Sequence, residues 1–183
     1  MIIDKDEVKE KKLGMFRDIS RGAVFLYPTD TIYGLGCDAS HDSSIRRLRQ
    51  MKGNYDKPFS IIVPSKEWIS HNCELSDEAK DWVDKLPGPY TLVLTLKHRK
   101  MFPDSLTGGL ETVGVRIPDH WVKDFVEEYG APIVTTSANK SGEMFMTNID
   151  DLDHDIKSHA NFIVYEGVKN GKPSRIIDLT VRK

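Results

Sequence analysis

Short apolar runs that suit β-strands alternate along this chain with longer segments of helical periodicity. In a segment that Asp119 can cap, Val122, Phe125, Val126 and Tyr129 recur at the spacing of one helix face. Several of the strand-like runs are too close in sequence for every connection to be a helical crossover. The pattern therefore predicts an α/β fold with one mixed sheet and flanking helices. The apolar runs lie at 23–27, 60–63, 91–97, 112–117, 132–134, 162–165 and 175–179.

Length and composition favour a single soluble domain that spans residues 1–183. The chain has 183 residues, 39% of them hydrophobic and 30% charged, with no internal repeat. A formal net charge of −2 argues against nucleic-acid binding over the whole surface but is compatible with a local basic cleft. No apolar run approaches the roughly 20 residues of a membrane span. Cys37 and Cys73 are expected to be reduced thiols of a cytoplasmic protein.

The segment 135–142 is the first candidate for a binding site. It reads Thr-Thr-Ser-Ala-Asn-Lys-Ser-Gly and follows the apolar run 132–134. Small hydroxyl, amide and glycine residues at the tip of a strand expose backbone donors, and ligands of open α/β sheets lie beyond strand ends. Thr135, Ser137 and Asn139 are therefore candidate ligand contacts. The alternative is an ordinary turn, where the same residue types are common.

A second polar segment, 27–39, combines threonine, aspartate and glycine. It reads Tyr-Pro-Thr-Asp-Thr-Ile-Tyr-Gly-Leu-Gly-Cys-Asp-Ala. Thr29 and Thr31 are two residues apart, so in an extended segment they face the same way. One interpretation is a β-turn that leads into an edge strand. The other is a hydroxyl-lined pocket with Tyr33 as one wall.

Cations are concentrated in a helix over 42–51 and in the loop after it. Arg46, Arg47 and Arg49 lie off the apolar stripe of this helix, which is typical of a solvated face. The following loop contains Lys52 and Lys57 and is a plausible anion contact.

Two further polar residues lie at strand ends, and several common motifs are missing. Arg116 either reaches the surface or is held for an anion, and Ser174 is either a turn residue or an anion contact. There is no Walker A sequence, no GxGxxG and no HExxH. Any nucleotide site must therefore be built from scattered loops, and the histidines do not suggest a metal site.

Five segments together resemble the YrdC family, in the family's order and spacing. They are 27–39, 87–94 (Pro-Gly-Pro-Tyr-Thr-Leu-Val-Leu), 113–120 (Val-Gly-Val-Arg-Ile-Pro-Asp-His), 132–142 and, more weakly, 173–178. The resemblance covers nearly the whole chain. It implies a twisted α/β sheet with a concave cleft and the activity of a threonylcarbamoyl-AMP synthase, a nucleotidyltransferase. Such enzymes join L-threonine, bicarbonate and ATP, with Mg²⁺ carried by the ATP and no protein metal site, and release pyrophosphate.

The resemblance also implies partners and residue roles. A partner transferase would then move the threonylcarbamoyl group to N6 of adenosine 37 of tRNA. The catalytic group would be Lys52, Ser137 and Asn139, and the nucleotide would also contact Lys57, Thr135 and Ser174. The threonine pocket would be formed by Thr29, Thr31, Tyr33 and Arg116.

One segment departs from the family pattern. The family's loop reads Lys-x-Arg-Pro, whereas this chain has Lys-Gly-Asn-Tyr-Asp-Lys-Pro-Phe at 52–59, with no arginine two residues after the lysine. Lys57, or an arginine among Arg46, Arg47 and Arg49, would have to supply that charge. The chain also ends without the C-terminal domain that helps to close the site in longer relatives, so either a loop covers the site or the site is more open.

Two other functions are alternatives to the synthase. One is a YciO-like paralogue that binds double-stranded RNA or tRNA without synthase activity. The other is a domain that handles carbamoyl adenylate, as found within larger hydrogenase-maturation proteins.

Overall fold

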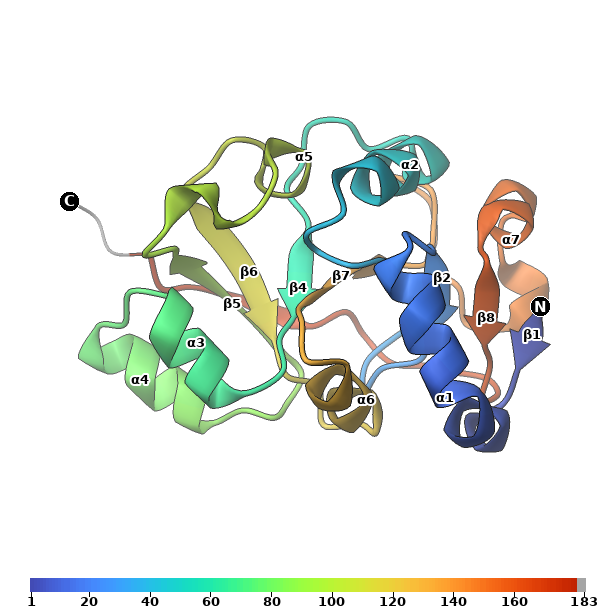
Figure 1. The fold of residues 1–183 in the computed structure, drawn as a ribbon, viewed down its shortest axis with the longest axis horizontal. Coiled ribbons are helices and arrows are strands. Elements are labelled where there is room, and N and C mark those ends of the chain that lie inside the picture. The colour runs from blue at the N-terminus through green and yellow to red at the C-terminus, as the bar shows by residue number, and fades with distance from the viewer. Residues whose placement is uncertain (181–183) are drawn as a thin grey trace.

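The computed structural model describes residues 1–180, and these build a nine-stranded mixed sheet with helices on both faces (Figure 1). The strand order is β1-β8-β2-β3-β7-β4-β6-β5-β9. The pairs β1–β8, β2–β8, β4–β6 and β5–β9 are parallel, and the other neighbouring pairs are antiparallel. The prediction of an α/β fold with a mixed sheet is confirmed.

The elements have the following bounds. The strands are β1 (Ile2–Ile3), β2 (Phe25–Tyr27), β3 (Gly34–Gly36), β4 (Ser60–Ile62), β5 (Tyr90–Thr95), β6 (Thr112–Arg116), β7 (Ile133–Ser137), β8 (Phe162–Val164) and β9 (Arg175–Asp178). The helices are α1 (Lys5–Ser20), α2 (Asp42–Lys52), α3 (Lys66–Asn72), α4 (Asp77–Asp84), α5 (Asp104–Thr107), α6 (Val122–Tyr129) and α7 (His154–His159). Two short 3₁₀ turns are η1 (Arg99–Met101) and η2 (Ile149–Asp151).

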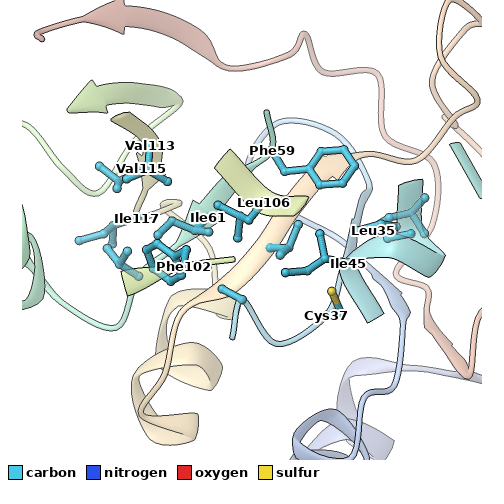
Figure 2. Packing of buried hydrophobic residues seen from close by; sticks show 14 of the residues in the cluster. Leu35, Cys37, Ile45, Phe59, Ile61, Phe102, Leu106, Val113, Val115 and Ile117 are labelled. Atoms are coloured by element: carbon cyan, nitrogen blue, oxygen red, sulfur yellow. The ribbon is translucent and has the colours of Figure 1, made fainter. Parts of the chain in front are cut away.

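The sheet is buried on both faces, because successive residues of its central strands enter different cores. In β4, Ile61 belongs to the larger cluster, shown in part in Figure 2, and Ile62 belongs to the smaller one. Side chains of α1 and α6 pack in the smaller cluster, and those of α2, α3, α4, α5 and α7 pack in the larger. Both cysteines are buried free thiols, and burial raises the pKa of Cys73 to about 12.

Helix starts follow local hydrogen bonding, with one correction to the prediction. Asp4 caps α1: its carboxylate accepts the N–H groups of Asp6 and Glu7, both at 2.9 Å. The prediction that Asp119 caps α6 is wrong, because Trp121 occupies that position. The Asp119 N–H instead donates to the carboxylate of Asp30, 3.0 Å away, which fixes the start of a loop at the functional site.

The segment 27–39 forms a hairpin in the middle of the sheet, so the interpretation as an edge strand is wrong. β3 pairs with β2 on one side and with β7 on the other. A Cβ atom at Gly36 would lie 2.4 Å from the carbonyl oxygen of Val134 and 2.8 Å from the Tyr27 ring. Glycine in this strand therefore allows the Tyr27 ring and β7 to approach closely. Among the described helices, none has the length and apolar character that a membrane span needs.

Candidate functional site

A cleft of about 350 Å³ lies where β3, β4 and β7 meet the loops that follow β2 and α2. The three strands bring polar residues together, since Gly34 pairs with Ser137 and Ser60 pairs with Thr135. The ten residues to which the family resemblance gives a role all line this one cleft: Thr29, Thr31, Tyr33, Lys52, Lys57, Arg116, Thr135, Ser137, Asn139 and Ser174. Their individual contacts to substrate stay predictions.

Thr29 and Thr31 form a hydroxyl corner, and their hydrogen bonds give them different roles. The Thr29 hydroxyl donates to the carbonyl of Ile32 at 2.7 Å and accepts the Thr31 N–H at 3.1 Å. The two hydroxyl oxygens are 3.0 Å apart, so Thr31 must be the donor between them. Thr29 is thereby saturated and positions Thr31, whose oxygen keeps a lone pair for a ligand.

Arg116 is held inside the cleft by an ion pair. Its Nη2 donates to Asp30 at 2.8 Å, and the two side chains are 7% and 9% exposed. The same nitrogen lies 3.3 Å from the Thr31 hydroxyl. Burial lowers the pKa of Arg116, and the carboxylate of Asp30 opposes this shift. The residue therefore does not reach the surface, and its buried Nε–H has no partner among the described residues, which leaves a donor for an anion.

Lys52 ties the end of α2 to the segment 135–142. Its ammonium donates to the carbonyls of Ser137 at 2.5 Å and Asn139 at 2.6 Å, and its own carbonyl accepts the Ser141 N–H at 2.8 Å. Burial lowers the pKa of Lys52 to about 8. Two of the three ammonium protons are thus committed to the loop, and the third is available to a ligand in the cleft.

Asn139 is oriented by its own loop and leaves one polar atom unpaired. Its amide nitrogen donates to the carbonyls of Lys140 at 2.9 Å and Glu143 at 2.8 Å. Its buried Oδ1 has no hydrogen-bond partner within the described chain. Because a buried acceptor without a partner is costly, this oxygen is a natural contact for a donor on a ligand.

The three arginines of α2 point to different places, and none of them lines the cleft. Arg46 pairs with Asp42 at 2.8 Å and is exposed, and Arg47 donates to Asn161. Arg49 is buried and holds the loop 53–59 from the helix side, so the prediction of a solvated face is wrong for this residue. Lys57 is the residue of this group that lines the cleft.

A strap formed by residues 165–174 crosses the hydroxyl corner. The Tyr33 hydroxyl donates to the Gly167 carbonyl at 2.6 Å and accepts the Glu166 N–H at 3.0 Å, and burial raises the pKa of Tyr33 to about 12. A Cβ atom at Gly171 would lie 1.9 Å from the carbonyl oxygen of Thr31, so the strap backbone rests on the corner itself. Tyr33 is among the residues that line the cleft, but its side chain is fully buried and its hydroxyl is committed to the strap.

Both ends of the strap are anchored. At its start, the Glu166 carboxylate binds His120 at 2.8 Å, the Trp121 indole N–H at 3.0 Å and Lys169 at 2.6 Å. At its end, the hydroxyls of Ser174 and Thr91 are 2.6 Å apart. The end of the strap, at Pro173 and Ser174, therefore lines one side of the cleft.

The cleft is not built to hold a metal ion through protein side chains alone. In the part of the chain that the structure describes, no group of three or more His, Cys, Asp or Glu residues could bind one. The polar side chains that line it are hydroxyls, the amides of Asn54 and Asn139, and cations. Such a site suits anionic groups that bring a divalent cation with its remaining waters.

Sequence reasoning missed several lining residues. Asn54, Ser60, Thr91, Thr136 and Ser141 also line the cleft, and Asp30 supports it through Arg116. Thr91 and Asp30 lie within segments that carried the family resemblance, which was the one available signal. Nothing in the local sequence showed that Asp30 and Arg116, 86 positions apart in the chain, would meet.

Comparisons with known proteins agree with this site. The family model for Sua5, YciO and YrdC, described as "Telomere recombination", matches residues 17–183. A relative from Methanocaldococcus jannaschii is 33% identical over 97% of this chain and 86% of its own length. A Vibrio vulnificus protein named threonylcarbamoyl-AMP synthase is 30% identical over 87% of this chain and 89% of its own length.

Solved structures show the same fold. P. abyssi Sua5 complexed with L-threonine matches with a TM-score of 0.87 and 32% identity over 98% of this chain, which spans 54% of that protein. E. coli YciO matches with a TM-score of 0.83 at 22% identity, a likeness that concerns the fold alone. The residues that the family model matches, 17–183, include every loop that builds the cleft. The chain therefore belongs to the Sua5/YciO/YrdC family.

Proposed function

We propose that this protein is an L-threonylcarbamoyladenylate synthase, a nucleotidyltransferase that acts in the cytoplasm on L-threonine, bicarbonate and ATP. The observation that carries the proposal is the convergence of ten candidate residues on one cleft. A relative that covers nearly the same length is named for this activity, and a structure similar over almost the whole chain is complexed with L-threonine. The RNA-binding alternative is not favoured by these names.

The reaction joins three anionic or potentially anionic groups, so charge compensation is the main task of the site. Threonine and bicarbonate first give the N-carboxylate of threonine and water. A carboxylate oxygen of this carbamate then attacks the α-phosphorus of ATP, and the bond to pyrophosphate breaks. Lys52, Lys57 and Arg116 supply the positive charge in the cleft. No side chain needs to act as a covalent nucleophile, because positioning and electrostatics suffice.

The threonine would lie at the hydroxyl corner. The uncommitted Nε–H of Arg116 offers a donor to its carboxylate, and the free lone pair of Thr31 offers an acceptor to its hydroxyl. A buried acceptor that pairs with a substrate hydroxyl discriminates strongly against analogues that lack the group. The strap backbone lies against this corner at Gly171, so it would exclude water and protect a carbamate and a mixed anhydride from hydrolysis.

The nucleotide would lie along segment 135–142 and loop 53–59. Ser137 and Asn139 are held by Lys52, and Thr135 and Ser174 add hydroxyls to the same wall. Mg²⁺ bound to the phosphates would neutralise the developing charge on the leaving pyrophosphate. The unpaired Oδ1 of Asn139 suits a water molecule bound to that ion better than it suits a phosphate oxygen. An amide oxygen and a phosphate oxygen are both acceptors, so they cannot hydrogen-bond to each other.

The product would be passed to a partner transferase that modifies adenosine 37 of tRNA. Threonylcarbamoyl-AMP is a reactive mixed anhydride, so a protein that consumes it promptly is expected. This step concerns a partner protein and tRNA, and it rests on the activity above.

The test is a reconstituted reaction of purified protein with ATP, Mg²⁺, bicarbonate and L-threonine. Mass spectrometry should detect threonylcarbamoyl-AMP, with pyrophosphate formed in equal amount. Serine in place of threonine, and omission of bicarbonate, serve as controls. Protein that binds ATP but forms no threonine-dependent product would refute the synthase. Salt-sensitive binding of double-stranded RNA by the same preparation would then identify the RNA-binding paralogue.

A further inference from the structure

Among the described residues, three cations line the cleft, and Lys57 of loop 53–59 is the one that is exposed to solvent. The two other cations of the cleft are already engaged: Lys52 with two carbonyls of segment 135–142, and Arg116 with Asp30. Lys57 is exposed and makes no ion pair within residues 1–180. A free ammonium on a loop is mobile, so its usefulness to a phosphate depends on how firmly the loop is held.

Arg49 holds this loop through hydrogen bonds from two of its guanidinium nitrogens. Its Nη1 donates to the carbonyls of Asn54 at 3.1 Å and Lys57 at 3.0 Å, and its Nε donates to the carbonyl of Ser105 at 2.6 Å. The guanidinium also lies 4.5 Å from the centre of the Phe59 ring. One buried side chain thus joins α2, both sides of loop 53–59 and the start of α5.

These contacts determine which side of the loop faces the cleft. A carbonyl oxygen is the negative end of a peptide dipole, so carbonyls turned into the cleft would repel phosphates. The Asn54 and Lys57 carbonyls are turned towards Arg49, which does not line the cleft. The Lys57 N–H bonds to the Asn54 side chain at 3.1 Å, and Phe59 N–H bonds to the Leu106 carbonyl at 3.0 Å. With the backbone fixed at these points, Lys57 is held where it lines the cleft.

We propose that Arg49 is a positioning residue for nucleotide binding, which presents the Lys57 ammonium to the phosphates while it turns two carbonyls away from them. The inference deepens the proposed function and rests on it for the identity of the ligand. The sequence offered Lys57 and the three arginines of α2 as sources of the loop's positive charge. Of these, Lys57 contacts the phosphates and Arg49 positions Lys57. Arg46 and Arg47 do not take part, because they are engaged elsewhere.

Lysine cannot replace Arg49 in this role. A guanidinium is a planar fork that reaches three carbonyls and stacks on a ring at once, whereas an ammonium is a compact point charge on a flexible stem. Arg49→Lys therefore keeps the charge and most of the packing volume but loses the simultaneous hold on Asn54, Lys57 and Ser105. Arg46→Lys is the matched control on the same helix, since Arg46 is exposed and lies outside the cleft.

The experiment measures binding of MgATP by calorimetry, without turnover, for the wild type and the variants R49K, R49M, K57M, R49M/K57M and R46K. K57M should weaken ATP binding roughly tenfold, as expected for loss of one charged hydrogen bond. R49K and R49M should weaken it by about threefold to tenfold, with threonine affinity unchanged. The double variant should bind no more weakly than K57M, because Arg49 acts through Lys57. R46K should match the wild type.

Several results would overturn the inference. These are wild-type ATP affinity in a folded R49K protein, a double variant whose loss is the product of the two single losses, or an equal loss of ATP and threonine affinity. Should R49M fail to fold, R49K carries the test, with its melting temperature measured alongside. A wild-type chain that binds ATP but forms no product would refute the synthase and leave this inference standing, whereas one without ATP affinity would refute the inference itself.

Discussion

The substitution Asp30→Asn removes the charge that balances Arg116 and leaves the rest of the corner in place. In the wild type, Asp30 accepts Arg116 Nη2 at 2.8 Å and the Asp119 N–H at 3.0 Å, and both partners of the ion pair are buried. Removing one member of a buried ion pair costs about 3–5 kcal/mol, because the other charge is left uncompensated. Asparagine keeps one acceptor oxygen for these two donors, so we expect the lower end, about 3 kcal/mol.

This free-energy change corresponds to a melting temperature lowered by roughly 6–12 °C for a chain of this size. L-threonine should partly reverse the loss. A bound carboxylate beside Arg116 would replace the missing Asp30 charge, so saturating threonine should raise the melting temperature of D30N by more than it raises that of the wild type.

The assay is thermal unfolding of D30N and wild type, each with and without saturating L-threonine. Asp119→Asn is the matched control, because Asp119 is exposed and contributes only its backbone N–H to Asp30. It should unfold within about 1 °C of the wild type, as surface substitutions usually do. A D30N protein as stable as the wild type would refute the argument for the ion pair. Equal shifts with threonine would refute the placement of the substrate carboxylate at Arg116.

Two further predictions follow from Lys52 and Gly171. Because burial lowers the pKa of Lys52 from 10.5 to about 8, its positive charge is lost as the pH rises through 8. kcat/KM for ATP should therefore fall between pH 7 and 9, and a K52M variant that kept the same descending limb would contradict this. The sign for stability is opposite: between about pH 8 and 10.5 the folded chain binds fewer protons at Lys52 than the unfolded chain, so this group's contribution to stability rises with pH. Gly171→Ala places a methyl group against the Thr31 carbonyl, so it should displace the strap and raise KM for threonine. Gly14→Ala is the control, because a Cβ atom at Gly14 in α1 meets nothing within 4 Å. This variant should leave KM for threonine unchanged and stabilise the fold by about 0.5–1 kcal/mol. Equal KM values for the two variants would refute the role of the strap.

Much of the site was predictable because polar residues follow buried strands. Thr135, Ser137 and Asn139 come directly after the apolar run of β7, and the sheet brings that strand end beside β3 and β4. The strands themselves were visible because their β-branched residues are buried on both faces. The fold class and the gathering of the candidate residues in one place therefore follow from local patterns.

The rest depends on contacts that local patterns do not contain. Arg49 lies off the apolar stripe of α2 and looks solvated, because the loop that buries it folds back over the helix only in three dimensions. The run Gly34–Gly36 is too short and too poor in side chains to reveal a central strand. Saturation of the Thr29 hydroxyl by Thr31 and Ile32 is likewise a matter of exact geometry. For these residues, sequence predicts the place but not the role.

The strap connects β8, near one end of the strand order, with β9 at the other, and passes the hydroxyl corner on the way (Figure 1). A single cut by a protease within residues 168–172 would separate the Glu166 anchor from the Ser174 anchor, while Glu166 stayed bound to His120 and Ser174 to Thr91. The nicked protein would remain folded, but the strap would no longer be held over the hydroxyl corner from both ends. Limited proteolysis would thus detect ligand binding at the corner. Threonine bound beneath the strap should slow cleavage within residues 168–172 and leave cleavage elsewhere unaffected.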